Sequence, residues 1–210
     1  MLSSAAFASG KPIRTRRCQN GKSCEKISDG EHNGYKAILK LALGNSWTFV
    51  RDLKMQLYFL RHGEADWPNW RKPDDERPLT DSGKKEVRQV AKFLERLKVR
   101  PDLIVSSPLP RASQTAKIAA TCLKAKLRED ESLAPGFGIS ELRTLLRRHR
   151  AKVLMLVGHE PDFTTVISGL SGASLKLSKA GVALLDVAPD LEEGKLFWLF
   201  PPKLVRKAKS

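Results

Sequence analysis

The feature that most constrains the fold is a run of five residues without a polar side chain, Val153-Leu154-Met155-Leu156-Val157. A strand that is apolar on both faces needs cover on both faces, and a parallel sheet between layers of helices provides it. The run breaks at a Gly-His pair, which ends the apolar pattern abruptly. It therefore predicts a central, doubly covered strand of an α/β protein.

Further strand and helix patterns alternate along the chain from Met55. Apolar runs at 57–60 and 103–105 predict two more strands, and apolar residues recur at helical spacing over 87–97, after a suitable N-cap at Thr80. Other helices are expected from about Pro110, around 139–146 and from Pro161 as first residue, and strands near 174–178, 182–188 and 195–200. This order predicts one α/β domain over residues 55–210, a three-layer α/β/α sandwich with a mostly parallel sheet.

The first 54 residues differ from this pattern. Residues 1–24 hold five Lys or Arg residues and no acidic residue, and only a weak helical run over 35–43 follows. The first 54 residues contain no long apolar segment of the kind that a secretory signal peptide has. We expect residues 1–54 to be a basic leader that is disordered or that results from a start site assigned too far upstream, with an organelle transit peptide as a third interpretation.

Charge limits the classes of partner. The chain has 38 Lys and Arg residues against 23 Asp and Glu, a formal net charge of +15, and both the leader and the remaining residues are basic. Such a charge favours anionic partners: nucleic acid, an acidic membrane or a phosphorylated substrate. No apolar run approaches the roughly 20 residues of a membrane span, and three cysteines cannot form a disulfide scaffold. We expect a cytoplasmic protein without a membrane partner.

Polar residues follow each of the three apolar strands. They are Arg61-His62-Gly63, then Ser106-Ser107-Pro108 with Arg111, and Gly158-His159. The carboxyl ends of neighbouring parallel strands share the edge at which α/β proteins bind ligands. Guanidinium groups and helix N-termini bind phosphate oxygens, and a neutral imidazole can attack phosphorus. The strand ends therefore predict a phosphate pocket, with no set of metal ligands and no cofactor.

These segments resemble the motifs of the histidine phosphatase superfamily, which has the phosphoglycerate mutase-like fold. Arg61-His62-Gly63 is similar to the family's Arg-His-Gly motif, and Gly158-His159-Glu160-Pro161 is similar to its second-histidine motif. Two further motifs lie between them in the family's order: Pro78-Leu79-Thr80 with Gly83, and Ser106-Ser107-Pro108 with Arg111 and Gln114-Thr115-Ala116. The resemblance extends from about Met55 to the C-terminus.

The resemblance implies a role for each pocket residue. His62 would be the nucleophile that takes the phosphoryl group, and water would then hydrolyse the phosphohistidine. Arg61 and Arg111 would hold the phosphoryl oxygens, and His159 would donate a hydrogen bond to them. Gly63 would contribute to substrate binding.

Departures from the family pattern indicate which subfamily the chain resembles. Many mutases and small-molecule phosphatases of the family have Asn five residues after the motif glycine, where this chain has Pro68. They also carry a longer insert with an acidic proton donor before the second histidine, which here follows Arg111 by only 48 positions. Three candidate donors remain: Glu160, which is our first choice because it follows the second histidine, Glu64 and Glu131.

The short interval and the unassigned acid resemble the phosphohistidine phosphatase SixA family. That resemblance implies hydrolysis of phosphohistidine in a signalling protein, whose imidazole leaving group needs less help from an acid than an alkoxide does. A general phosphomonoesterase acting on a small phosphorylated metabolite is the alternative enzyme. A phosphate- or nucleic-acid-binding basic module is the alternative without catalysis, although no recognised nucleic-acid motif is present and we do not expect such a partner.

Overall fold

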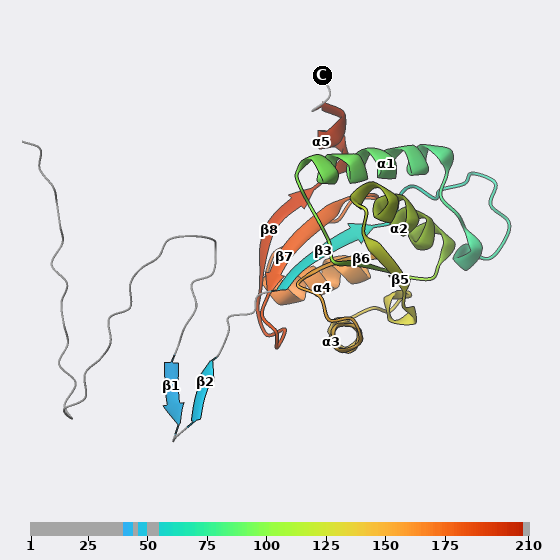
Figure 1. Ribbon diagram of the computed structural model, residues 1–210. Helices are drawn as coiled ribbons and strands as arrows, with labels where there is room; N and C mark the ends of the chain where they lie inside the picture. Colours follow the sequence, from blue (N-terminus) through green and yellow to red (C-terminus); the bar gives the residue numbers. More distant parts are fainter. Residues whose placement is uncertain (1–39, 44–45, 50–54, 208–210) are drawn as a thin grey trace, which may run out of the picture. The chain divides into compact units, whose positions relative to one another are not determined.

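A computed structural model gives the fold of the chain (Figure 1). The structure describes residues 40–43, 46–49 and 55–207. The chain divides into two compact units, Met1–Lys36 and Ala37–Ser210, and every described residue lies in the second. Most of the predicted leader, residues 1–54, therefore lies outside the described residues.

Two short strands occupy the described part of the leader. β1 (Lys40–Leu43) and β2 (Ser46–Phe49) form an antiparallel pair in which Leu43 lies opposite Ser46. The predicted helical run over 35–43 is wrong for residues 40–43. Gly-Asn, the sequence between the two strands, is typical of a two-residue hairpin loop, and Trp47, Thr48 and Phe49 all favour strands.

A six-stranded sheet forms the centre of the 55–207 region. Its strands are β3 (Met55–Arg61), β4 (Leu103–Ser106), β5 (Lys126–Glu129), β6 (Val153–Gly158), β7 (Val182–Val187) and β8 (Gly194–Phe200), in the order β5-β4-β6-β3-β7-β8. The four strands from β5 to β3 are parallel, whereas β7 runs antiparallel to both β3 and β8. The apolar run lies in β6, in the interior of the sheet, as predicted.

Helices cover both faces of this sheet (Figure 1). α1 (Asp81–Arg96), α2 (Pro110–Leu123) and α5 (Pro202–Lys207) cover one face, and α3 (Ile139–Arg148) and α4 (Asp162–Ser171) cover the other. Alternate residues of β3 show the division, because Tyr58 and Leu60 pack in the first layer, and Leu57 and Phe59 in the second. The predicted three-layer α/β/α sandwich is confirmed. None of the described helices has the length and apolar character that crossing a membrane requires.

Local sequence signals set the helix boundaries. The Thr80 hydroxyl caps α1 by accepting a hydrogen bond from Gly83 N at 3.0 Å. Pro110 is in the first turn of α2, and Gly172, with a φ of 68°, follows the last residue of α4. The sequence predicts Pro161 as the first residue of α4, but it is the residue just before the helix.

Two strand predictions differ from the structure. Residues 174–178 are described and form no strand; the Leu177 carbonyl instead accepts a hydrogen bond from Arg61. β5 escapes prediction because it is an edge strand whose sequence, Lys126-Leu127-Arg128-Glu129, is mostly exposed and charged. An edge strand needs no alternation of apolar residues, so its sequence carries little signal.

Candidate active site

The register of the sheet brings the three predicted strand ends together. β6 lies between β4 and β3, with Arg61 opposite Gly158. The residues just beyond the strands are hydrogen-bonded across these ends, His62 N to Gly158 O at 3.0 Å and Ser107 N to Val157 O at 2.9 Å. The predicted convergence at one edge of the sheet is confirmed.

Two imidazoles lie beside each other at this edge. The ring centroids of His62 and His159 are 5.3 Å apart, and the two residues are only 8% and 4% exposed. A neighbouring group holds each ring. His62 Nδ1 lies 2.7 Å from Gly63 O, and His159 Nε2 lies 2.9 Å from Ser107 Oγ.

The contact with Gly63 assigns the proton of His62, whereas the contact with Ser107 is compatible with either tautomer of His159. A carbonyl oxygen can only accept, so His62 Nδ1 carries a proton and donates it to Gly63 O, which leaves a lone pair on Nε2. His159 Nδ1 is buried and has no hydrogen-bond partner among the described residues. When His159 Nε2 accepts from the Ser107 hydroxyl, Nδ1 holds the remaining proton and can donate it to a ligand.

Burial keeps both imidazoles uncharged at neutral pH. The pKa of His62 falls from 6.5 to about 4; burial is the largest cause, and the positive charges of Arg111 and Arg61 act in the same direction, against the effect of the Gly63 hydrogen bond. Burial likewise lowers the pKa of His159 to about 3, together with His62 and the same two arginines. A neutral His62 keeps the lone pair that a nucleophile needs.

Both predicted arginines lie at this edge. Arg61 Nη1 donates to Leu177 O at 2.9 Å, while its buried Nε has no partner among the described groups. Arg111, in the first turn of α2, is 6% exposed and donates from Nη1 to Asp74 O at 2.7 Å. Because both guanidinium groups influence the pKa values of both histidines, the four predicted residues form one electrostatic unit.

Asp74 and Arg77 are site residues that the sequence analysis missed. Asp74 begins the short 3-10 helix η1 (Asp74–Glu76), and its carboxylate lies 3.3 Å from Arg111 Nη2 and 2.7 Å from Arg77 Nη2. The charge of Arg77 also lowers the pKa of His62. The position of Arg77 directly before the Pro-Leu-Thr motif is a signal that could have identified it, whereas no sequence pattern joins Asp74 to α2.

Gly63 holds the predicted nucleophile, His62, in place. Its N–H donates to Thr115 Oγ1 at 3.1 Å and its carbonyl accepts from His62, so both polar groups are used within the protein. A Cβ atom at this position would lie 2.6 Å from Val87 Cγ2, which explains the need for glycine. These contacts give Gly63 a positioning role, and its part in substrate binding stays a prediction.

The three candidate proton donors lie in different surroundings. Glu160 is half-buried; burial raises the pKa of its carboxyl group, and its Oε1 has no partner among the described residues. Glu64 accepts hydrogen bonds from the hydroxyls of Ser82 and Thr80 at the start of α1. Glu131 is exposed in η2 (Glu131–Leu133), and no described hydrogen bond or ion pair joins its side chain to the site. The surroundings favour Glu160.

The arrangement suits transfer of a phosphoryl group. A neutral imidazole supplies a nucleophile, a second imidazole supplies an N–H donor, and guanidinium groups supply charge for the phosphoryl oxygens. Within the described ranges, no three His, Cys, Asp or Glu side chains gather in a way that could hold a metal ion.

Comparison with known proteins gives one consistent family. The model of the histidine phosphatase superfamily (branch 1) matches residues 57–151. An uncharacterized protein of Picosynechococcus sp. is 36% identical over 162 residues, which cover 71% of this chain and 98% of the relative. Phosphohistidine phosphatase SixA of Escherichia coli is 38% identical over 163 residues, which cover 74% of this chain and 99% of the relative. A solved structure of the protein histidine phosphatase SixA complexed with tungstate has a similar fold, with a TM-score of 0.64, 23% identity and coverage of 72% of this chain and 99% of that one.

We predict that the protein loses stability when the pH is lowered from 7 to 5. His62 and His159 have pKa values of about 4 and about 3 in the folded chain, against about 6.5 in an unfolded chain. Between these values the unfolded chain binds protons that the folded chain does not. The free energy of unfolding therefore decreases as the pH is lowered from 7 to 5, by on the order of 2 kcal/mol for one such histidine. Thermal melting at the two pH values measures the loss.

The matched variant is His62→Gln, which removes one of the two titrating groups. Its melting temperature should decrease less between pH 7 and pH 5 than that of the wild type. An equal or larger loss in the variant would contradict a buried, neutral His62.

We also predict that Asp74→Asn binds orthophosphate more tightly than the wild type. The Asp74 carboxylate is an anion paired with Arg111, so a phosphate must compete with it for the same guanidinium. The Asp74 carboxylate is exposed to solvent although Arg111 is buried, and such a pair contributes about 0.2–1 kcal/mol, which corresponds to a gain in affinity of up to about fivefold. Titration calorimetry with orthophosphate measures it. Asp75→Asn, in the same short helix, is the control and should change affinity less; unchanged or weaker binding by Asp74→Asn would refute the competition.

Proposed function

The chain belongs to the histidine phosphatase superfamily, and we propose that it hydrolyses phosphohistidine in a signalling protein through a phosphohistidine intermediate on its own His62. The observation that carries this proposal is the hydrogen bond from His62 Nδ1 to Gly63 O. It directs the proton of the ring into the protein and leaves Nε2 free to attack. A lowered pKa keeps this nitrogen unprotonated at neutral pH.

In the first step, the lone pair of His62 Nε2 attacks the phosphorus of the substrate. A new P–N bond forms while the P–N bond to the substrate imidazole breaks, and the electron pair goes to the leaving nitrogen. When the other ring nitrogen of the substrate carries a proton, the leaving group departs as neutral imidazole and needs no proton from the enzyme. Arg61 and Arg111 would hold the phosphoryl oxygens, and the N–H of His159 Nδ1 would donate to one of them.

In the second step, water attacks the phosphorus of phospho-His62. The new P–O bond replaces the P–Nε2 bond, His62 recovers its lone pair, and the proton lost by the water passes to solvent as orthophosphate leaves. The Gly63 carbonyl holds the ring throughout both steps, so the nucleophile returns to its starting state. Positioning and charge stabilisation supply most of the acceleration in phosphoryl transfer.

Two observations favour phosphohistidine over a phosphate ester. The relative from Escherichia coli is named phosphohistidine phosphatase SixA and is similar over 99% of its length. Between α2 and β6 the chain forms only β5, η2 and α3, so no additional domain is inserted there that would cover the edge of the sheet. Without such a domain, a histidine that projects from a folded protein would meet less obstruction at the strand ends. We keep a cytoplasmic location and a phosphorylated protein partner as predictions.

A general phosphomonoesterase remains the second candidate because of Glu160. Its pKa is raised by burial, its Oε1 has no partner among the described groups, and it follows His159 directly. A carboxyl group in this state could protonate an alkoxide leaving group. A phosphate-binding module without catalysis would have no use for a nucleophilic lone pair held in this way.

We predict that Glu160→Gln separates these substrates. Hydrolysis of a phosphohistidine protein should fall by less than about tenfold, because its leaving group does not require an acid, whereas a true proton donor contributes about 10²–10⁴-fold. Hydrolysis of p-nitrophenyl phosphate and of an alkyl phosphate, measured beside it, should fall more for the alkyl ester, which has the poorer leaving group.

Glu64→Gln is the second variant, and Glu131→Gln is the control because Glu131 is exposed in η2. The control should behave as the wild type on every substrate. A drop of a hundredfold or more on phosphohistidine in any of the three variants would mean an obligatory acid and would favour the phosphomonoesterase.

A further inference from the structure

Three basic side chains form a stripe along α1. Lys85, Arg88 and Lys92 are all exposed and are spaced by three and four residues, which places them on one face of the helix. We call these three residues the basic stripe. Its two ends, Lys85 and Lys92, are seven positions apart on the helix, which corresponds to a length of about 10 Å.

The three residues of the basic stripe take part in no described salt bridge, although Glu64 and Glu86 line a pocket with Lys85, and Glu95 acts on Cys122 together with Lys92. Asp81 of the same helix is paired with Lys84. The arginines of α3, on the other face of the sheet, differ: Arg143 lies 3.9 Å from Glu192, and Arg148 lies 3.2 Å from Asp130. The charge of α1 is therefore left for an outside partner to a greater degree than that of α3.

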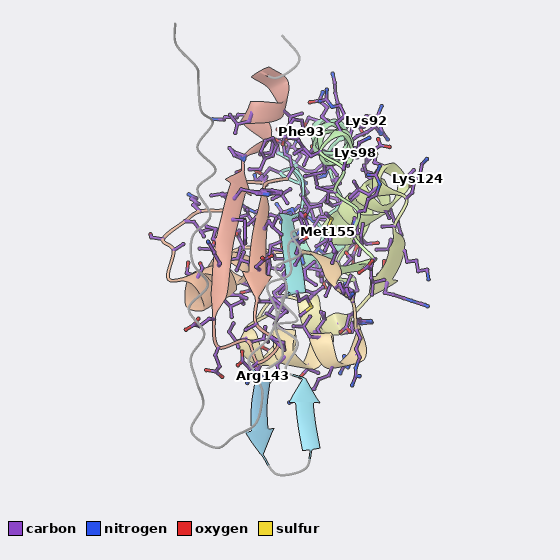
Figure 2. The ribbon with its side chains drawn as sticks, turned by 60° about the vertical axis from the view of Figure 1, so that its left-hand side comes forward. Lys92, Phe93, Lys98, Lys124, Arg143 and Met155 are labelled. Carbon is purple, nitrogen blue, oxygen red and sulfur yellow. The ribbon has the colours of Figure 1, made fainter. Side chains whose placement is uncertain are left out.

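Positive charge extends from α1 onto the neighbouring helix. α2 packs against α1, and both Lys117 of α2 and Lys124, which directly follows α2, are exposed. Figure 2 shows Lys92 and Lys124 on the same side of the molecule. Lys92 and Arg88 also lie near enough to Cys122 of α2 to lower its thiol pKa, against the larger effect of burial, which raises it. The basic stripe thus lies within a broader positive surface of the α1 and α2 layer.

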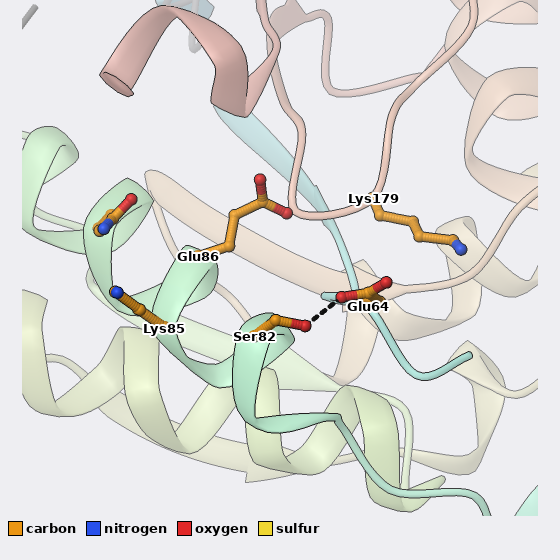
Figure 3. A pocket seen from close by; sticks show the side chains of 6 residues that line it. Glu64, Ser82, Lys85, Glu86 and Lys179 are labelled. Atoms are coloured by element: carbon orange, nitrogen blue, oxygen red, sulfur yellow. Dashed lines mark hydrogen bonds between the residues drawn. The ribbon is translucent and has the colours of Figure 1, made fainter. Parts of the chain in front are cut away.

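The basic stripe begins beside the catalytic loop. A pocket next to the start of α1 is lined by Glu64, Ser82, Lys85, Glu86, Gln89 and Lys179 (Figure 3). Glu64 lies two residues after the nucleophile and is hydrogen-bonded to Ser82. Lys85 belongs both to this pocket and to the basic stripe, so a continuous surface connects the stripe with the loop that holds His62.

We propose that the basic stripe is the docking surface for an acidic segment of the phosphorylated protein, next to the phosphohistidine that enters the site. The proposal rests on the proposed function, because it names the partner that the same site acts on. Carboxylates on that partner would pair with Lys85, Arg88 and Lys92 while its phosphohistidine reaches His62. An extended segment of three or four residues has the length of the basic stripe. Nucleic acid is the competing occupant, and the test includes it.

The test uses two phosphohistidine peptides that differ only in the four residues on either side of the phosphohistidine, Glu in one and Gln in the other. At low salt, the full chain should have a KM for the Glu peptide about tenfold lower than for the Gln peptide. Each exposed ion pair is weak, but several of them together can produce a difference of this size. The preference should shrink at about 0.5 M salt, where exposed charges are screened.

The decisive variant is Lys85→Glu/Arg88→Glu/Lys92→Glu. It should lose the preference for the Glu peptide through KM, with kcat for that peptide changed by less than about twofold. Arg143→Glu/Arg147→Glu/Arg150→Glu is the matched control, since it reverses the same number of exposed charges on the other face. It should keep the preference.

Each outcome decides one question. Hydrolysis of both peptides by the wild type without a preference, or a preference that survives the stripe variant, overturns the docking surface. A gel shift with duplex DNA that is lost in the stripe variant, while the peptide preference is unchanged, assigns the surface to nucleic acid and also overturns it. If neither peptide nor phosphoramidate is hydrolysed, the proposed function itself is wrong and the docking surface falls with it.

Discussion

The hydrogen bond from His62 Nδ1 to the Gly63 carbonyl is the interaction on which the account of this site depends. It spans 2.7 Å within two consecutive residues, so the backbone just after β3 fixes the tautomer of the ring. The loop in turn needs glycine, because a side chain at position 63 would collide with Val87 of α1. A nucleophile, a strand end and the packing of the first helix are thereby joined in one local arrangement.

Burial and positive charge act on this site in the same direction. Arginines beside an imidazole disfavour its protonated form, as desolvation does, so the groups that we expect to bind a phosphate also keep His62 and His159 neutral. Within residues 55–207, Asp74 is the one carboxylate that forms an ion pair with Arg111. A phosphate that replaces it would bring more negative charge to the same guanidinium. On this account, phosphate binding would exchange one anion on Arg111 for another.

Much of the site could be predicted because its residues follow apolar strands. The runs that end at Leu60, Val105 and Val157 are clear in the sequence, and parallel neighbours bring their ends together. Asp74 could not be predicted, since it acts across the 19 residues between β3 and α1, which have no periodic pattern. The same limit explains β5, an exposed edge strand, and residues 174–178, whose apolar alternation serves loop packing and a carbonyl contact to Arg61. Residues 40–43 are predicted as part of a helix but form a strand, because a short apolar run fits a helix or a strand equally well.

The most direct test of the account is to trap phosphorus on His62 during turnover. The wild type is mixed briefly with ³²P-labelled phosphoramidate and quenched in alkali, in which phosphohistidine survives, and the labelled residue is identified after proteolysis. The account predicts label on His62 that is stable to base and lost in acid, and none in His62→Ala. Orthophosphate release at the full rate with no label on His62, or label on another residue, would contradict it.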